Sequence, residues 1–316
     1  MAGKLDLDLD LDLDLDLDLG SRPGSGGGPR FNSDDFPRLI PAPFPPTIPV
    51  PTLDYSLGGW DPELRSWAYV EEFIASYAAP NTAVTTVRAA IYGQSYFPVP
   101  NRYGILTGIT RPLTPTDMAL QVKGVLDASI DRADRSLEII DQASGRGALH
   151  YWTGMLRIDP SKDKNTFLLM LVARKIGEYV AMGLKDHFQM RRPAQVYPLI
   201  MPLVDGPDTP SFPSSHSLQA HLITGVLKLA LNTPVLPVWP PVGPPPPPCA
   251  NAAQALDVLA DRIAYNREVA GVHYRMDSLA GHFAAVQILN QLHNLPASGP
   301  FQKLVGDANR ELKDVH

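Results

Sequence analysis

The sequence predicts an all-α fold: a helical bundle with long proline-rich loops and an extended N-terminal arm. Apolar residues recur with helical spacing in six long windows after about residue 55. Outside the N-terminal tail, few segments alternate apolar and polar residues as a strand does. Prolines crowd residues 37–52 and 233–251, where neither a helix nor a central strand can form.

The chain divides into three regions by composition. Residues 1–30 are of low complexity, with a Leu-Asp repeat over residues 5–19 followed by a glycine-rich linker. Residues 31–54 predict a proline-rich extended arm, and residues 55–316 predict the folded α-helical domain. The repeat has two interpretations: an unstructured acidic tail or artefact, or a strand that orders by pairing with other copies and makes a homo-oligomer.

The charge balance argues against nucleic acid as a partner. The net charge is −6, but the repeat holds seven aspartates, so the rest of the chain carries −6 + 7 = +1. A nearly neutral body lacks the basic excess of a nucleic-acid-binding surface. No apolar run is long enough for a membrane span and no secretory signal is visible, so we expect a cytoplasmic protein that acts on a small molecule.

Six helices are expected in chain order. The first begins with Asp61 as N-cap and Pro62 at the first helical position. A long amphipathic helix and an apolar, central helix follow, and then three more. The predicted windows are residues 60–79, 114–143, 163–192, 215–232, 253–271 and 276–293.

The first motif that carries chemistry is "KDHFQMRRP", which contains Lys185, Arg192 and Pro193. Lys185 and Arg192 are seven residues apart, so two helical turns would place them on the same face. Pro193 favours a helix end there. By itself, this motif is also compatible with a solvated basic helix end.

The second motif is "PSSHS", with Ser214, Ser215 and His216 at the start of a predicted helix. Free N–H groups in a first helical turn bind anions, and Ser214 or Ser215 can cap the helix or donate to an anion. The simpler alternative is an ordinary serine cap with an incidental histidine.

The third motif is "NREVAGVHYRMD", with Arg267 late in a helix that Gly271 is expected to end. His273 and Asp277 are four residues apart, so one turn of a new helix brings the carboxylate beside the imidazole. A carboxylate bonded to one ring nitrogen fixes the tautomer and aims the other nitrogen. A surface histidine with an acidic neighbour is the alternative.

Together, Lys-x6-Arg-Pro, Pro-Ser-x-His and Arg-x5-His-x3-Asp resemble the motifs of the superfamily of vanadium-dependent haloperoxidases and type 2 phosphatidic acid phosphatases. The resemblance covers roughly residues 160–292 and implies the helical bundle of that superfamily. It implies that His273 is the vanadate ligand or the phosphorylated nucleophile, with Asp277 orienting it. It further implies oxyanion contacts from Lys185, Arg192, Ser214, Ser215 and Arg267, and an acid/base role for His216. Lys185 would also help His216 to polarise peroxide.

The chain departs from this pattern at two positions. Relatives usually carry glycine at the position of Ser215 and serine at that of Asn266. A Cβ at position 215 would crowd the oxyanion if the backbone there is tightly apposed to it or needs a positive φ.

Two enzymatic functions follow from the resemblance, and a third function does not need catalysis. The stretches around His216 and His273 are more similar to haloperoxidases, which oxidise halide with hydrogen peroxide on a vanadate cofactor. The alternative is a soluble acid phosphatase, which hydrolyses phosphomonoesters through phospho-His273 without a cofactor. Haloperoxidases often carry an aromatic residue or histidine at the position of Thr209, which weighs against haloperoxidase activity. The third function is that of a weakly active scaffold that assembles through the Leu-Asp tail.

The remaining histidines are expected to contribute less. His221 is expected to lie on the flank of the pocket, and His150 and His282 are expected to be packing or surface residues. No Cys/His cluster with zinc-ligand spacing is visible in the sequence.

Overall fold

A computed structural model describes residues 61–75, 97–100, 106–109, 115–143, 148–233 and 251–313. The tail of residues 1–30, the arm of residues 31–54, the expected start of the domain near residue 55 and the proline-rich loop of residues 234–250 lie outside these ranges.

The described part of the chain is helical, with one short hairpin, and this confirms the predicted all-α class. The helices are α1 (Pro62–Ala75), α3 (Pro115–Ala128), α4 (Arg132–Gln142), α5 (Leu149–Leu156), α6 (Lys164–Phe188), α7 (Pro193–Val196), α8 (Ser215–Ala230), α9 (Ala252–Ala270), α10 (Arg275–His293) and α11 (Pro300–Lys313). Two 3₁₀ turns, η2 (Ser129–Asp131) and η3 (Pro198–Ile200), join some of them. Strands β1 (Phe97–Pro100) and β2 (Leu106–Ile109) pair antiparallel, with Phe97 opposite Ile109.

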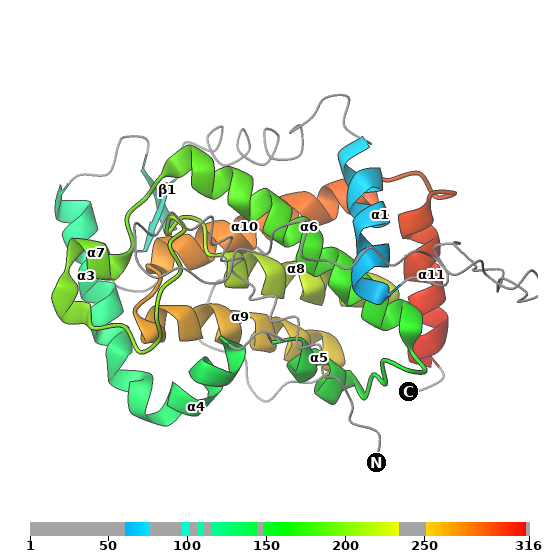
Figure 1. Cartoon of the computed structure of the whole chain (residues 1–316), viewed down its shortest axis with the longest axis horizontal. Helices are drawn as coiled ribbons and strands as arrows, with labels where there is room; N and C mark the ends of the chain where they lie inside the picture. Colours follow the sequence, from blue (N-terminus) through cyan, green and yellow to red (C-terminus); the bar gives the residue numbers. More distant parts are fainter. Residues whose placement is uncertain are drawn as a thin grey trace, which may run out of the picture. The chain divides into compact units, whose positions relative to one another are not determined.

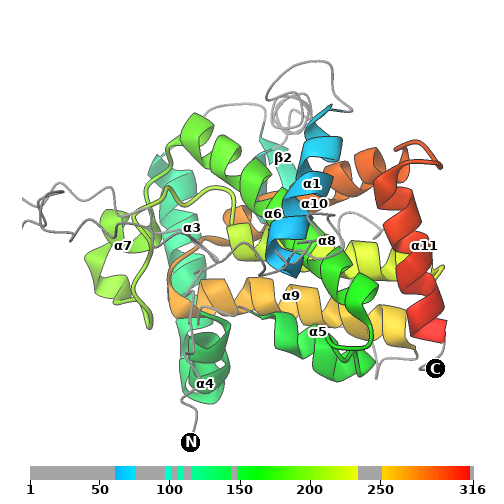
Figure 2. The same ribbon diagram turned by 45° about the vertical axis from the view of Figure 1, so that its right-hand side comes forward.

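Helix α8 is the centre of the bundle and packs against α6, α9 and α10 (Figures 1 and 2). Every residue of α8 except Leu229 is buried. Gly225 and Gly281 allow the close contacts between α8 and α10, because a Cβ at Gly281 would lie 2.6 Å from the backbone oxygen of Ser214. The α8–α10 crossing therefore holds the start of α8 against the first turns of α10.

Helices α1 and α11 both pack against α6 (Figure 1). Glu311 of α11 accepts hydrogen bonds from the backbone nitrogens of Asn165 and Thr166, at 3.0 and 2.7 Å. These are two of the unsatisfied donors in the first turn of α6, so the carboxylate caps this helix from another part of the chain. The cap fixes the long central helix at the end opposite to Lys185.

The single helix predicted over residues 114–143 is wrong, because the chain bends there. Helix α3 ends at Ala128, η2 follows, and α4 leaves in a new direction (Figure 1). The hydroxyl of Ser129 donates to the carbonyl oxygen of Leu126 at 2.7 Å. A serine that bonds back to the preceding turn competes with the helical ladder and favours a bend.

The helix predicted over residues 163–192 is also too long. Helix α6 ends at Phe188, and Gln189 follows in a left-handed conformation with φ of 49°. Helices α5, α7 and α11 and the β1–β2 hairpin were not predicted from the sequence. Helix α5 has eight residues and α7 has four, too few for a helical period to be recognised.

Candidate active site

The junction between α9 and α10 carries His273. Gly271 ends α9 with φ of 85°, as predicted, and Tyr274 precedes the first residue of α10. The backbone nitrogen of Tyr274 donates to Oδ2 of Asp277 at 2.9 Å, so Asp277 caps the new helix. This cap holds the Asp277 carboxylate beside the imidazole of His273, which is itself buried.

The His273–Asp277 contact predicted from the spacing of four residues is present. Nδ1 of His273 lies 3.1 Å from Oδ2 of Asp277. The same oxygen accepts a hydrogen bond of 2.6 Å from Oγ of Ser211. Because an ionised carboxylate only accepts hydrogen bonds, Nδ1 of His273 carries the proton, and Nε2 keeps its lone pair.

Arg192 lies on the other side of the His273 ring. Its Nη1 is 3.4 Å from Nε2 of His273 and donates to the carbonyl oxygen of Val272 at 3.1 Å. Nε and Nη2 donate to the carbonyl oxygen and to Oγ1 of Thr209, at 2.8 and 3.0 Å. The guanidinium is 5% exposed and is held by three protein oxygens beside the ring nitrogen that carries the lone pair.

Lys185 and Arg192 do not share one helix face, in contrast to the prediction from their spacing. Lys185 lies in the last turn of α6, but Arg192 lies beyond the end of that helix in extended backbone, with φ of −69° and ψ of 157°. The two side chains still reach one segment. Nζ of Lys185 donates to the carbonyl oxygen of Pro210 at 2.6 Å, next to the Thr209 oxygens that Arg192 binds.

Burial raises the pKa of Asp277 to about 6. Hydrogen bonds from Ser211 and Tyr274, and the positive charges of Lys185 and Arg192, oppose this rise by favouring the anion. The carboxylate is therefore ionised at neutral pH but becomes protonated in mildly acidic solution. The orientation of His273 depends on this charge.

The start of α8 faces the first turn of α10. Ser214 is the N-cap of α8, as predicted, and its Oγ accepts from the backbone nitrogen of Ser217 at 3.3 Å. The backbone nitrogen of Ser214 donates to the carbonyl oxygen of Asp277 at 3.1 Å. Ser215 is buried, its backbone has no positive φ, and its Oγ has no hydrogen-bond partner. A positive φ at Ser215 is therefore absent, and crowding of an oxyanion by its Cβ stays a prediction.

His216 lies in the first turn of α8 and is 8% exposed. It lines a cavity with Trp152, Arg174 and Gln219, whereas the contacts measured for His273 are to Arg192, Ser211 and Asp277. Its predicted role as acid/base toward a ligand on His273 stays a prediction.

Arg267 is buried late in α9, and its Nη2 donates to the carbonyl oxygen of Ile139 and to Oε1 of Gln142, at 3.0 and 3.2 Å. The neighbouring Asn266 donates to the same Oε1 at 3.0 Å. Asn266 thus ties α9 to α4. An oxyanion contact from Arg267 also stays a prediction.

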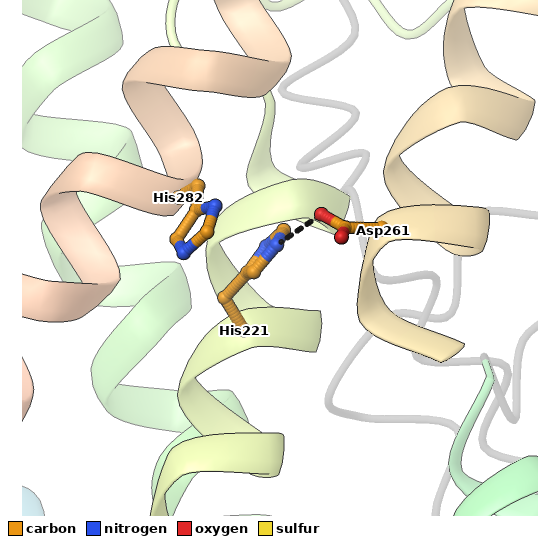
Figure 3. Close-up of side chains that lie close together, drawn as sticks. All are labelled: His221, Asp261 and His282. Atoms are coloured by element: carbon orange, nitrogen blue, oxygen red, sulfur yellow. Dashed lines mark hydrogen bonds and ion pairs between the residues drawn. The ribbon is translucent and has the colours of Figure 1, made fainter. Parts of the chain in front are cut away.

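Ser211 and the structural role of Thr209 were not predicted from the sequence. Both lie in an irregular segment, where no periodicity predicts which way a side chain points. A group formed by His221, Asp261 and His282, which are brought together from α8, α9 and α10, was not predicted either (Figure 3). His221 and His282 are 61 positions apart in the chain, so no local spacing reveals this pair.

None of the helices in the described segments combines the length and apolarity that crossing a bilayer requires. No curated protein matches the chain. Residues 166–296 match the family model described as the PAP2 superfamily. This range begins in α6, ends just after α10, and contains Lys185, Arg192, His216, His273 and Asp277. This part of the chain, residues 166–296, is therefore similar to the PAP2 superfamily.

Proposed function

We propose that the protein hydrolyses phosphomonoesters, with Nε2 of His273 as the nucleophile. The observation that supports this most is the buried His273, whose Nδ1 is held by Asp277 while Nε2 faces the guanidinium of Arg192. The match of residues 166–296 to the PAP2 superfamily model supports a phosphatase or haloperoxidase type of chemistry.

The tautomer of His273 suits nucleophilic attack. Asp277 accepts the Nδ1 proton and stabilises the positive charge that forms on the ring when Nε2 bonds to phosphorus. Ser211 and the backbone of Tyr274 hold the carboxylate in turn. The nucleophile is thus oriented before substrate binds, which removes part of the entropic barrier.

Two buried cations supply the charge that a phosphoryl group requires. Arg192 and Lys185 are 5% and 1% exposed, and they meet at the Thr209–Pro210 carbonyls. We assign them, with Ser214, Ser215 and Arg267, to the non-bridging oxygens of the substrate. Fixed donors in a buried site stabilise charge that develops in the transition state more strongly than water does.

The reaction then proceeds in two displacements. Nε2 of His273 attacks phosphorus, the bond from phosphorus to the ester oxygen breaks, and His216 gives a proton to the leaving oxygen. Water next attacks the phosphoryl group, His216 takes a proton from that water, and the phosphorus–nitrogen bond breaks to release phosphate.

Vanadate-dependent halide oxidation is the second candidate, supported by the likeness of the stretches around His216 and His273 to haloperoxidases. The residues fit vanadate, since a histidine lone pair faces a buried cation; His273 would ligate it, with Lys185, Arg192, Ser214 and Arg267 around its oxygens. Bound vanadate supplies a centre that activates hydrogen peroxide toward halide. We rank this second because Thr209, at the position where haloperoxidases often carry an aromatic residue or histidine, has both oxygens engaged by Arg192.

One pair of assays separates the two functions. The purified protein is given p-nitrophenyl phosphate without metal, and separately bromide, peroxide and a phenol dye after incubation with orthovanadate. We expect phosphate release that vanadate inhibits and that His273→Ala abolishes. Vanadate-dependent bromination without phosphate release would assign haloperoxidase activity instead. If the protein shows neither phosphate release nor bromination, both proposed functions are contradicted.

A further inference from the structure

We propose that His221, Asp261 and His282 form a binding site for a divalent transition-metal ion, of which zinc is the best fit. The three side chains come from α8, α9 and α10 and lie next to one another, with His221 between Asp261 and His282 (Figure 3). One ligand atom from each lies within 4.8 Å of the others. This inference is independent of the proposed hydrolytic reaction.

The hydrogen bonds of His221 identify the atom that would bind the metal. Nδ1 of His221 lies 2.7 Å from the carbonyl oxygen of Ser217. A carbonyl oxygen can only accept, so Nδ1 carries a proton. Metal-ligating histidines commonly donate their second ring N–H to a backbone carbonyl in this way, which fixes the orientation of the ring. Nε2 of His221 is thereby aimed away from the helix, at Asp261.

Two possible ligand atoms face each other at this point. Nε2 of His221 lies 3.2 Å from Oδ1 of Asp261. With a proton on Nδ1, His221 meets the carboxylate either as an imidazolium that donates from Nε2, or as a neutral ring whose Nε2 lone pair shares a cation with Asp261. In a tetrahedral zinc site with bonds of about 2.0–2.1 Å, neighbouring ligand atoms are separated by about 3.3 Å. The observed separation matches that edge.

His282 supplies the third ligand from α10. Its ring lies over that of His221, with centroids 3.7 Å apart and planes inclined by 16°. The His282 side chain is 6% exposed and can supply a nitrogen ligand from a buried position.

The stacked arrangement requires one movement. In-plane lone pairs of nearly parallel rings do not point at a common ion, so the His282 ring has to tilt out of the stack on binding. Nearby cations are compensated: Lys228 contacts Asp257 at 2.7 Å, and Arg275 contacts Glu268 at 3.0 Å. The Asp261 side chain is 59% exposed, so the ion and a water ligand can enter from solvent.

A metal at this point would join the three helices that carry the candidate active site. His221 and His282 lie five residues after His216 and Asp277 on their helices, and Asp261 lies six residues before Arg267. Because the ion binds only the assembled helices, it stabilises the folded state. We therefore assign a structural role to this site.

The test titrates the full-length, chelator-treated protein with Co²⁺ and Zn²⁺, followed by visible Co²⁺ absorption and calorimetry. We expect saturable binding of one ion per chain. Bound Co²⁺ should show the intense visible absorption of a tetrahedral site with nitrogen ligands. Asp261→Asn, which changes an exposed side chain, should weaken binding by at least about tenfold. His282→Gln should abolish the tetrahedral spectrum, and zinc should raise the melting temperature of the wild type but not of either variant.

His150→Gln is the matched control, because His150 also contacts an aspartate, Asp141, at 2.8 Å, but lies outside the cluster. The His150→Gln variant should bind Co²⁺ and Zn²⁺ as tightly as the wild type does. The aspartates of residues 5–19 remain in every variant, so weak binding to them is a constant background. An absence of saturable binding, or binding that Asp261→Asn and His282→Gln leave unchanged, would overturn the proposal and identify the contact as a His221–Asp261 ion pair. Phosphatase activity is measured in parallel, and its loss or retention does not bear on this outcome.

Discussion

Nδ1 of His273 lies 3.1 Å from Oδ2 of Asp277, and both side chains are buried. This contact fixes the tautomer of His273 and leaves Nε2 facing Arg192 at 3.4 Å. The proposed hydrolysis depends on it, and the first two predictions concern the carboxylate that makes it.

Protonation of Asp277 should switch the proposed hydrolysis off in acid. Since burial raises the pKa of this carboxyl to about 6, the fraction of anion falls as the pH falls through that value. Without the anion, His273 loses its acceptor and the stabilisation of its positive charge. We expect kcat/KM for p-nitrophenyl phosphate to fall below about pH 6. Asp277→Asn should lower kcat by about 10–100-fold and remove this fall in kcat/KM, the acid limb of the pH profile. An acid limb that is unchanged in the variant would show that another group causes it.

Ser211→Ala should move the same limb to higher pH. The hydroxyl of Ser211 donates to Asp277 at 2.6 Å and lowers the pKa of the carboxyl, so its removal raises that pKa. A lost hydrogen bond to a buried charge also costs about 1.5–3 kcal/mol of stability. Urea unfolding and pH–rate profiles measure the two effects. The exposed Ser161, whose hydroxyl also contacts an aspartate, is the matched control, and Ser161→Ala should change neither.

Arg192 and Arg191 are neighbours with opposite environments, which makes them a natural pair for comparison. Arg192 is buried beside His273, and Arg191 is exposed. Arg192→Ala should lower kcat by about 10²–10³-fold, since it removes a fixed donor to the phosphoryl oxygens. Circular dichroism checks that both variants fold. Equal losses of activity in Arg192→Ala and Arg191→Ala would contradict the assignment.

Ser215→Ala should stabilise the protein and weaken its binding of phosphate. The buried Oγ of Ser215 has no hydrogen-bond partner, and such a group costs about 1–3 kcal/mol. Removing it should raise the free energy of unfolding in the absence of ligand. If this hydroxyl contacts the substrate, the inhibition constant for inorganic phosphate should rise. A variant that is less stable and binds phosphate normally would assign Ser215 a packing role only.

The sequence predicted the local parts of this site better than its three-dimensional assembly. The cap at Ser214, the end of α9 at Gly271 and the His273–Asp277 contact depend on neighbours in the chain, and the structure confirms all three. The convergence of Lys185 and Arg192 was predicted by the wrong route, because α6 ends at Phe188 and the chain turns through Gln189.

Contacts between distant segments could not be predicted. Ser211 reaches Asp277 across 66 positions, and Gln142 reaches Arg267 across 125. Such pairs depend on how helices cross, which one sequence does not specify through spacing. The His221–His282 stack was missed for the same reason, and both histidines had been expected at the margin of the site or in packing roles.

The most direct test of the account is to trap the intermediate on His273. The protein is mixed with p-nitrophenyl phosphate, quenched in alkali during steady-state turnover, and digested for mass spectrometry under conditions that preserve phosphohistidine. We predict a phosphoryl group on the peptide that contains His273, absent from the His273→Ala variant. Steady phosphate release from wild-type protein with no phosphohistidine, or with the label on another residue, would contradict the assignment of His273 as the nucleophile.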